Sequence, residues 1–213
     1  MEVSIPDREF KLELPDPKTG GCSILMIGST RCGKTTALKH ILDRYFKKHL
    51  GAIFSESAKA PAYQHMKYPN LPLASCFIPE LIKDSYFINK DLKNYYDFLY
   101  VLDDCPLIRG DKQLMKMLTI YRNSNVSAIT CVQDPSMLTP TCRSNFNFVL
   151  LFHQNAADRT EFIVKNFLRG WLPTGMKLEE KMAWFQNATK DHHFLFLDNL
   201  NGTIQRCKIS VGK

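Results

Sequence analysis

The sequence predicts an α/β fold with a mostly parallel sheet flanked by helices. Three continuous apolar runs support this, because strands buried on both faces of a parallel sheet have such runs: Cys22–Ile27, Phe98–Leu102 and Val126–Val132. Segments with apolar residues at helical spacing alternate with them, beginning with Ala37–Phe46. Strands that alternate with helices indicate crossover connections and hence a parallel sheet.

The remaining elements follow from apolar spacing and turn residues. Along the chain we expect a short edge strand at Glu9–Leu14, a strand at Gly51–Ser55, a short strand near Ser75–Ile78, helices over Glu80–Asp97 and Asp111–Asn123, a strand at Phe146–Phe152 and a helix over Met176–Asn187. Asn201-Gly202 is a typical hairpin turn, so Phe194–Leu197 and Thr203–Ile209 are predicted to form an antiparallel C-terminal hairpin.

Composition restricts the class of protein. The chain of 213 residues carries a net charge of +7, a modest excess that is compatible with a polyanionic partner. Its apolar runs are far shorter than the ~18 residues of a membrane span, and its first residues do not resemble a signal peptide. The seven cysteines form no C-x-x-C pair, so neither a disulfide framework nor a zinc module is indicated. We therefore expect a soluble, intracellular protein with reduced thiols and no membrane-spanning segment.

A phosphate-binding loop follows the first buried run. Gly28-x-x-x-x-Gly33-Lys34-Thr35 is a complete P-loop motif with a strand before it and an amphipathic helix after it. Backbone N–H groups of such a loop surround phosphate oxygens, Lys34 reaches the β and γ phosphates, and the Thr35 hydroxyl is a ligand for Mg²⁺. The nucleotide-binding residues are therefore expected to be Gly28, Ser29, Thr30, Arg31, Cys32, Gly33, Lys34, Thr35 and Thr36.

Polar side chains end the next two buried runs. Asp103 follows Phe98–Leu102, where P-loop proteins place the carboxylate that holds Mg²⁺. Asp104 is a candidate base for the attacking water; the alternative is an ordinary loop carboxylate. Gln133 follows Val126–Val132, so its amide is expected at the ligand-binding edge of the sheet, as a sensor of the γ-phosphate or the water.

In combination, these motifs resemble the FtsK–HerA superfamily of DNA-pumping ATPases. The resemblance rests on the Lys34 loop, Asp103-Asp104-Cys105 after an apolar strand, a helix ending in Arg122 and a strand ending in Gln133. Within the superfamily, the short length and the Asp-Asp-Cys variant are similar to the genome-packaging ATPases of poxviruses, other large DNA viruses, virophages and double-jelly-roll phages. The motifs cover about residues 23–152.

The resemblance implies a P-loop NTPase fold of the additional-strand type, in which the Gln133 strand lies between the strands that end at Gly28 and Asp104. It further implies an ATP- and Mg²⁺-dependent motor that moves viral double-stranded DNA into a preformed capsid as a homo-oligomeric ring. Capsid or portal-vertex proteins would be its partners, and the host cytoplasm or the virion its location. Asp104 departs from the commoner glutamate, which leaves the base open.

Ring ATPases usually complete one subunit's site with a cation from a neighbour. Arg122 and Arg143 are both candidates for this trans-acting finger, and for each an ordinary solvated or helix-capping arginine is the alternative. We expect one domain over residues 1–213. It comprises an N-terminal edge strand and turn (1–21), a nucleotide-binding core (22–152) and C-terminal helices with the hairpin (153–213).

Three other functions are alternatives to the motor. A GTPase is disfavoured because Asn89-Lys90-Asp91 lacks the Asn-Lys-x-Asp spacing that reads guanine. A nucleoside or nucleotide kinase suits the length but would need a substrate-binding Asp-Arg pair and an Arg-rich lid, which the sequence does not show. A nucleotide-bound assembly factor that hydrolyses nothing is the third alternative, against which the intact Lys34-Thr35 and Asp103-Asp104 argue.

Overall fold

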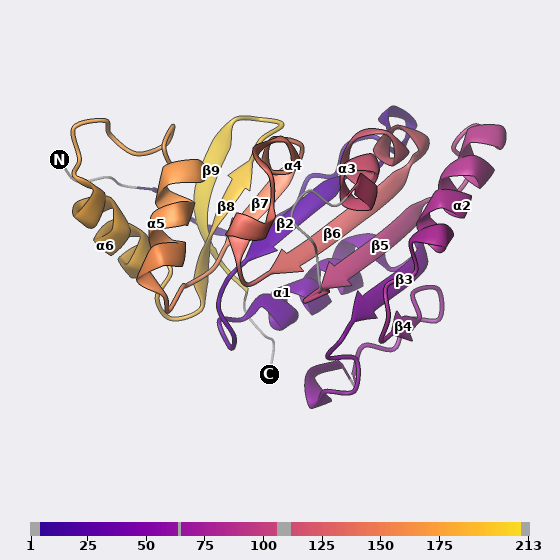
Figure 1. The fold of residues 1–213 in the computed structure, drawn as a ribbon, viewed down its shortest axis with the longest axis horizontal. Coiled ribbons are helices and arrows are strands. Elements are labelled where there is room, and N and C mark those ends of the chain that lie inside the picture. The colour runs from indigo at the N-terminus through magenta and orange to yellow at the C-terminus, as the bar shows by residue number, and fades with distance from the viewer. Residues whose placement is uncertain (1–4, 64, 106–111, 210–213) are drawn as a thin grey trace.

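The computed structural model describes residues 5–63, 65–105 and 112–209. In this part of the chain nine strands form one sheet, in the order β1-β9-β8-β7-β2-β6-β5-β3-β4 (Figure 1). The strands are β1 (Asp7–Glu9), β2 (Ser23–Ile27), β3 (Leu50–Ser55), β4 (Leu73–Ala74), β5 (Phe98–Asp103), β6 (Val126–Val132), β7 (Phe148–Leu151), β8 (His193–Asp198) and β9 (Thr203–Lys208). Neighbours pair in parallel except β7 with β8 and β8 with β9. The predicted fold class and the antiparallel C-terminal hairpin are therefore confirmed.

Helices cover both faces of the sheet (Figure 1). They are α1 (Lys34–Ile41), α2 (Pro79–Asp91), α3 (Lys112–Thr119), α4 (Pro140–Ser144), α5 (Ala157–Asn166) and α6 (Leu178–Ala188). One apolar core joins side chains of α2 to α6 to one face, and a second core joins α1 and the segment after β1 to the other. No helix in the described segments is long and apolar enough to cross a lipid bilayer.

The central strands bring the predicted site residues to one edge. β6 lies between β2 and β5, in parallel register with both, so Ile27 pairs with Val132 and Asp103 with Cys131. This is the additional-strand arrangement that the resemblance implies. Since parallel strands end on the same side, the P-loop, Asp104 and Gln133 follow neighbouring carboxyl ends.

Several element boundaries differ from the predictions. Residues 10–14 form no strand; the edge strand is Asp7–Glu9, paired with β9. Phe10 and Leu12 are instead buried in the core beside α1, and the Leu12 N–H donates to the Tyr45 hydroxyl at 3.0 Å. Side-chain packing therefore produces the alternation that resembled a strand.

Three further elements have boundaries that differ from the predicted ones. The short strand predicted near Ser75–Ile78 is Leu73–Ala74. α2 ends at Asp91 rather than Asp97, because Lys93 and Asn94 adopt positive φ angles of 52° and 61°, which an α-helix does not contain. The predicted start of the next helix, Asp111, lies outside the described residues, and α3 ends at Thr119.

Candidate active site

The P-loop depends on glycine at two positions. A Cβ at Gly28 would lie 2.6 Å from both Cys32 Sγ and Phe152 Cβ, so the loop leaves no room for a side chain there. Gly33 caps the N-terminus of α1 with a φ of 102°, in the left-handed region that favours glycine. These two constraints direct the loop over the N-terminus of α1, where a helix favours anions.

Lys34 is buried inside this loop, with 7% of its surface exposed. Its Nζ donates to the Gly28 carbonyl and, at 2.9 Å, to the Ser29 carbonyl. Burial is compatible with the charge because carbonyl oxygens accept hydrogen bonds from the ammonium group. The ammonium group is thus held at the centre of the loop, where the oxygens of a bound phosphate would compete for it.

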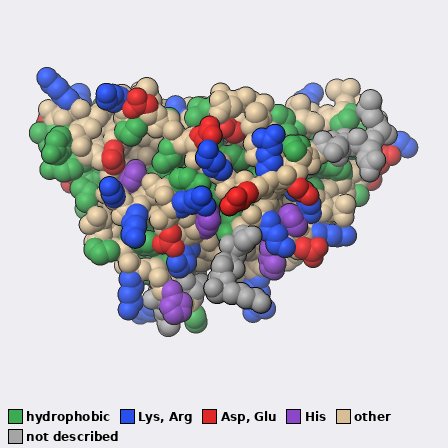
Figure 2. Space-filling view, turned by 180° about the vertical axis from the view of Figure 1, so that it is seen from behind, with side chains coloured by type: hydrophobic (Ala, Val, Ile, Leu, Met, Phe, Trp, Pro, Cys, Tyr) green, Lys and Arg blue, Asp and Glu red, His purple; other side chains and the backbone are tan. Residues whose placement is uncertain are grey.

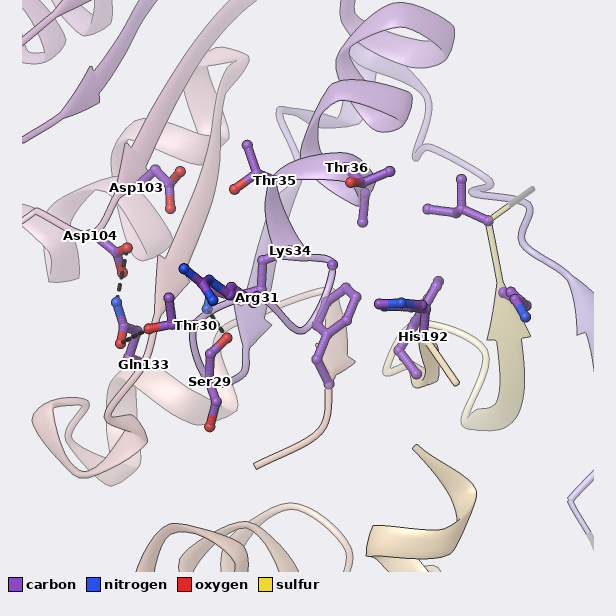
Figure 3. Close-up of a pocket in the computed structure, with 16 residues that line it drawn as sticks. Ser29, Thr30, Arg31, Lys34, Thr35, Thr36, Asp103, Asp104, Gln133 and His192 are labelled. Atoms are coloured by element: carbon purple, nitrogen blue, oxygen red, sulfur yellow. Dashed lines mark hydrogen bonds between the residues drawn. The ribbon is translucent and has the colours of Figure 1, made fainter. Parts of the chain in front are cut away.

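Asp103 and Thr35 supply oxygen atoms on one side of the loop, and Figure 3 shows both facing the same pocket. Asp103 is 4% exposed. Its burial and, secondarily, the charge of Asp104 raise its pKa to about 6, against the opposing effect of Lys34. A carboxylate and a hydroxyl suit Mg²⁺, which usually takes few protein ligands and completes its shell with phosphate oxygens and water. Within the described residues, no three His, Cys, Asp or Glu side chains form a group that could hold a metal ion.

Gln133 connects the P-loop to Asp104 (Figure 3). Its Oε1 accepts a hydrogen bond from Thr30 Oγ1 at 3.1 Å, and its Nε2 donates to Asp104 Oδ2 at 3.1 Å. Asp104 has a φ of 48°, and its N–H lies 3.3 Å from the Cys131 carbonyl at the end of β6. The three predicted polar residues, Asp103, Asp104 and Gln133, therefore line one pocket together with the P-loop.

That pocket, of about 570 Å³, extends well beyond the sequence motifs. Its lining also includes Phe152 and residues of the C-terminal hairpin region, His192, Phe194, Lys208 and Ile209. Figure 3 shows His192 on the side away from Asp103 and Gln133. His192 lies in a turn in which it and Asp191 both have positive φ, and its Nδ1 would be 3.8 Å from a Cβ at Gly33. Sequence reasoning missed these residues because their contact with the loop arises only when β7, β8 and β9 pair.

The candidate finger arginines lie elsewhere in the chain. Arg122 donates to the Asn145 carbonyl at 3.1 Å and to Asn147 Oδ1 at 3.4 Å, and its own carbonyl accepts the Gly21 N–H. Gly21 precedes β2 and the P-loop follows it, so Arg122 lies near the opposite edge of the sheet, separated by about 17 Å of strand.

Arg143 is also engaged within the chain. It donates to the Leu138 carbonyl at 2.6 Å and to Asn166 Oδ1 at 3.1 Å, and its guanidinium lies 5.0 Å from the Phe162 ring centre. Neither arginine lines the nucleotide pocket of its own subunit, whereas Arg31 of the P-loop does. An action of Arg122 or Arg143 on a neighbouring subunit stays a prediction.

Comparisons with known proteins confirm the predicted resemblance at the level of the fold. No family model matches the chain. Uncharacterized protein 015R of Frog virus 3 is 25% identical over 95% of the chain, and protein 075L of Invertebrate iridescent virus 6 is 23% identical over 93%. The chain spans 64% of the first relative and 80% of the second.

Among solved structures, the genome-packaging NTPase B204 of Sulfolobus turreted icosahedral virus 2, in complex with AMPPCP, superimposes with a TM-score of 0.66. The match covers 92% of this chain and 100% of that protein at 16% identity. The cytoplasmic domain of the type VII secretion ATPase EccC of Thermomonospora curvata matches 92% of the chain and 25% of its own length, with a TM-score of 0.54 and 15% identity. The chain thus has the fold of P-loop NTPases, and its sequence relatives are proteins of large DNA viruses.

Proposed function

We propose that this protein is an ATP-hydrolysing motor that moves viral double-stranded DNA into a preformed capsid as a homo-oligomeric ring. One observation carries the proposal: the P-loop, Asp103, Asp104 and Gln133 line a single pocket at the carboxyl ends of three adjacent parallel strands. This is the arrangement that phosphoryl transfer to water requires, because catalysis there consists mainly of positioning and charge stabilisation.

Each residue has a distinct role in this proposal. Lys34 and the loop N–H groups hold the β and γ phosphates and stabilise the negative charge that develops on them. Asp103 and Thr35 would hold Mg²⁺, which neutralises charge on the phosphate oxygens. Gln133, fixed between Thr30 and Asp104, orients the attacking water or the γ-phosphate. The wall around His192 and Phe194 would take the nucleoside.

The DNA partner rests on the viral relatives, on the packaging role of B204 and on the net charge. On the face shown in Figure 2, Lys and Arg side chains are spread widely and interleaved with Asp and Glu. Capsid or portal-vertex proteins would complete the assembly.

ATP hydrolysis measured with and without duplex DNA tests the proposal. We expect DNA to stimulate turnover, and its affinity to be independent of sequence and to fall steeply with salt, because each neutralised phosphate releases counterions. Lys34→Ala should abolish hydrolysis and weaken ATP binding, since it removes the buried cation of the loop. The proposal would be contradicted if duplex DNA left the turnover of the wild-type protein unchanged, or if the Lys34→Ala variant hydrolysed ATP at a normal rate.

A further inference from the structure

A second cavity adjoins the nucleotide pocket at the end where the γ-phosphate would lie. It measures about 420 Å³, and Asp104 and Gln133 line both cavities. Its lining also includes Glu56, a residue outside every motif of the sequence. Glu56 therefore shares this cavity with the two polar side chains that also line the nucleotide pocket.

The strand pairing of the sheet determines the backbone position of Glu56. β3 pairs in parallel with β5, and its last residue, Ser55, lies opposite Asp103. The next residues, Glu56 and Asp104, therefore leave adjacent strands side by side at the same edge. A turn orients Glu56, because the Ala58 N–H donates to the Ser55 carbonyl at 3.1 Å and the Ser57 N–H to Ser55 Oγ at 3.2 Å.

The other two carboxylates of this cavity are already engaged. Asp134 accepts hydrogen bonds from the Ser136 N–H at 2.9 Å and from its hydroxyl at 2.6 Å. Asp104 accepts from Gln133. Within the described residues, no hydrogen bond or ion pair engages the Glu56 carboxylate, whose side chain is exposed. Glutamate is one methylene longer than aspartate, so the carboxylate of Glu56 can lie further from its strand than the carboxylate of Asp104.

We propose that Glu56 is the general base of ATP hydrolysis and that Asp104 acts as a positioning residue that holds the Gln133 amide. This inference rests on the proposed function. A water in the second cavity attacks the γ-phosphorus, its O–H proton passes to a Glu56 carboxylate oxygen, and the bond to the β,γ-bridging oxygen breaks. The bridging oxygen keeps the electron pair on ADP, inorganic phosphate is the other product, and Glu56 returns its proton to solvent.

The test compares Glu56→Gln, Glu56→Ala and Asp104→Asn with wild type. Glu179→Gln, an exposed substitution on α6 at the other end of the sheet, is the matched control. Glu56→Gln should lower kcat by at least ~100-fold, the usual contribution of a general base, and change the KM for ATP by less than about threefold. Glu179→Gln should leave both unchanged.

Chemical rescue separates a base from a structural residue. Added formate should restore part of the kcat of Glu56→Ala, because a small carboxylate can enter the space that the side chain leaves. It should not rescue Asp104→Ala, a further variant that leaves a similar space. A kcat of Glu56→Gln within twofold of wild type, or rescue of an Asp104→Ala protein but not of Glu56→Ala, would overturn the inference. Failure of the wild-type protein to hydrolyse ATP would instead reject the proposed function itself.

Discussion

At the scale of single residues, the site combines one buried cation with one buried acid. The charge of Lys34 is stabilised by hydrogen bonds to carbonyl oxygens of its own loop. The ionised form of Asp103 is instead disfavoured by burial and by the neighbouring charge of Asp104, which raise its pKa. Burial of an ionised carboxylate beside another one costs free energy that a bound cation would recover. If Asp103 holds Mg²⁺ as proposed, the protein without the metal carries this cost in its own stability.

This cost predicts how stability depends on pH in the absence of metal and nucleotide. The pKa of Asp103 is about 6 in the folded protein and about 3.9 in an unfolded chain. Between these values the folded state binds more protons, so the free energy of unfolding falls as pH rises from about 4 to about 6. Asp103→Asn removes the ionisation and should stabilise the protein by roughly 1 to 3 kcal/mol near pH 7.5.

Urea denaturation of wild type and Asp103→Asn near about pH 7.5 and near about pH 3 measures this effect. The difference should vanish near about pH 3, below both pKa values, where Asp103 is protonated in the folded and the unfolded state. An equal gain at both pH values would assign it to packing instead. The same variant should lose Mg²⁺-dependent ATP binding, since an amide is a poorer ligand than a carboxylate.

At the scale of elements, the sequence was most informative where burial is continuous. Every residue of β2, β5 and β6 is buried, and each strand coincides with an apolar run. The P-loop and the polar residues that end these strands were therefore predictable. The segment around Phe10 and the strand at Leu73–Ala74 were not, because their conformation depends on what they pack against.

The site contains residues that no local pattern indicates. His192 reaches the nucleotide pocket through a turn after α6, and Glu56 reaches the adjoining cavity through the pairing of β3 with β5. Both contacts join segments far apart in sequence. Charge and spacing within a motif contain no information about such pairs, so only the sheet order reveals them.

The pairing of β3 with β5 predicts a strongly destabilising substitution. Gly51 has a φ of 146°, and a Cβ there would lie 1.9 Å from the Leu99 carbonyl oxygen of β5. Gly51→Ala should therefore lower the free energy of unfolding by more than ~2 kcal/mol, because backbone atoms must move. Gly202→Ala, with φ of 62° but open space around it, should cost only about 1 kcal/mol. Equal losses in urea denaturation would show that β3 tolerates the displacement.

At the scale of the whole molecule, the nucleotide pocket lies on one edge of the sheet and opens to solvent. The chain supplies the loop, the metal carboxylate and Gln133 to this edge, while Arg122 and Arg143 are held outside the pocket by partners within the chain. Within the described residues, Arg31 and Lys208 also line this pocket. In the proposed ring, a second subunit would supply a further cation to the γ-phosphate. An arginine supplied in this way typically accelerates phosphoryl transfer by about 10³-fold or more.

Mixing of inactive variants tests this intersubunit step. The rate of ATP hydrolysis per subunit should rise with protein concentration. One of the two variants, Arg122→Ala or Arg143→Ala, should remove the trans-acting arginine and therefore bind ATP without hydrolysing it. Thermal unfolding of each arginine variant verifies its fold, because both side chains also bond within the chain. That variant and Lys34→Ala, each inactive alone, should regain activity together, since a ring can then pair an intact pocket with an intact arginine. Turnover that is independent of concentration and of both arginines would show that one chain completes the site, and would remove the mechanistic reason for a ring.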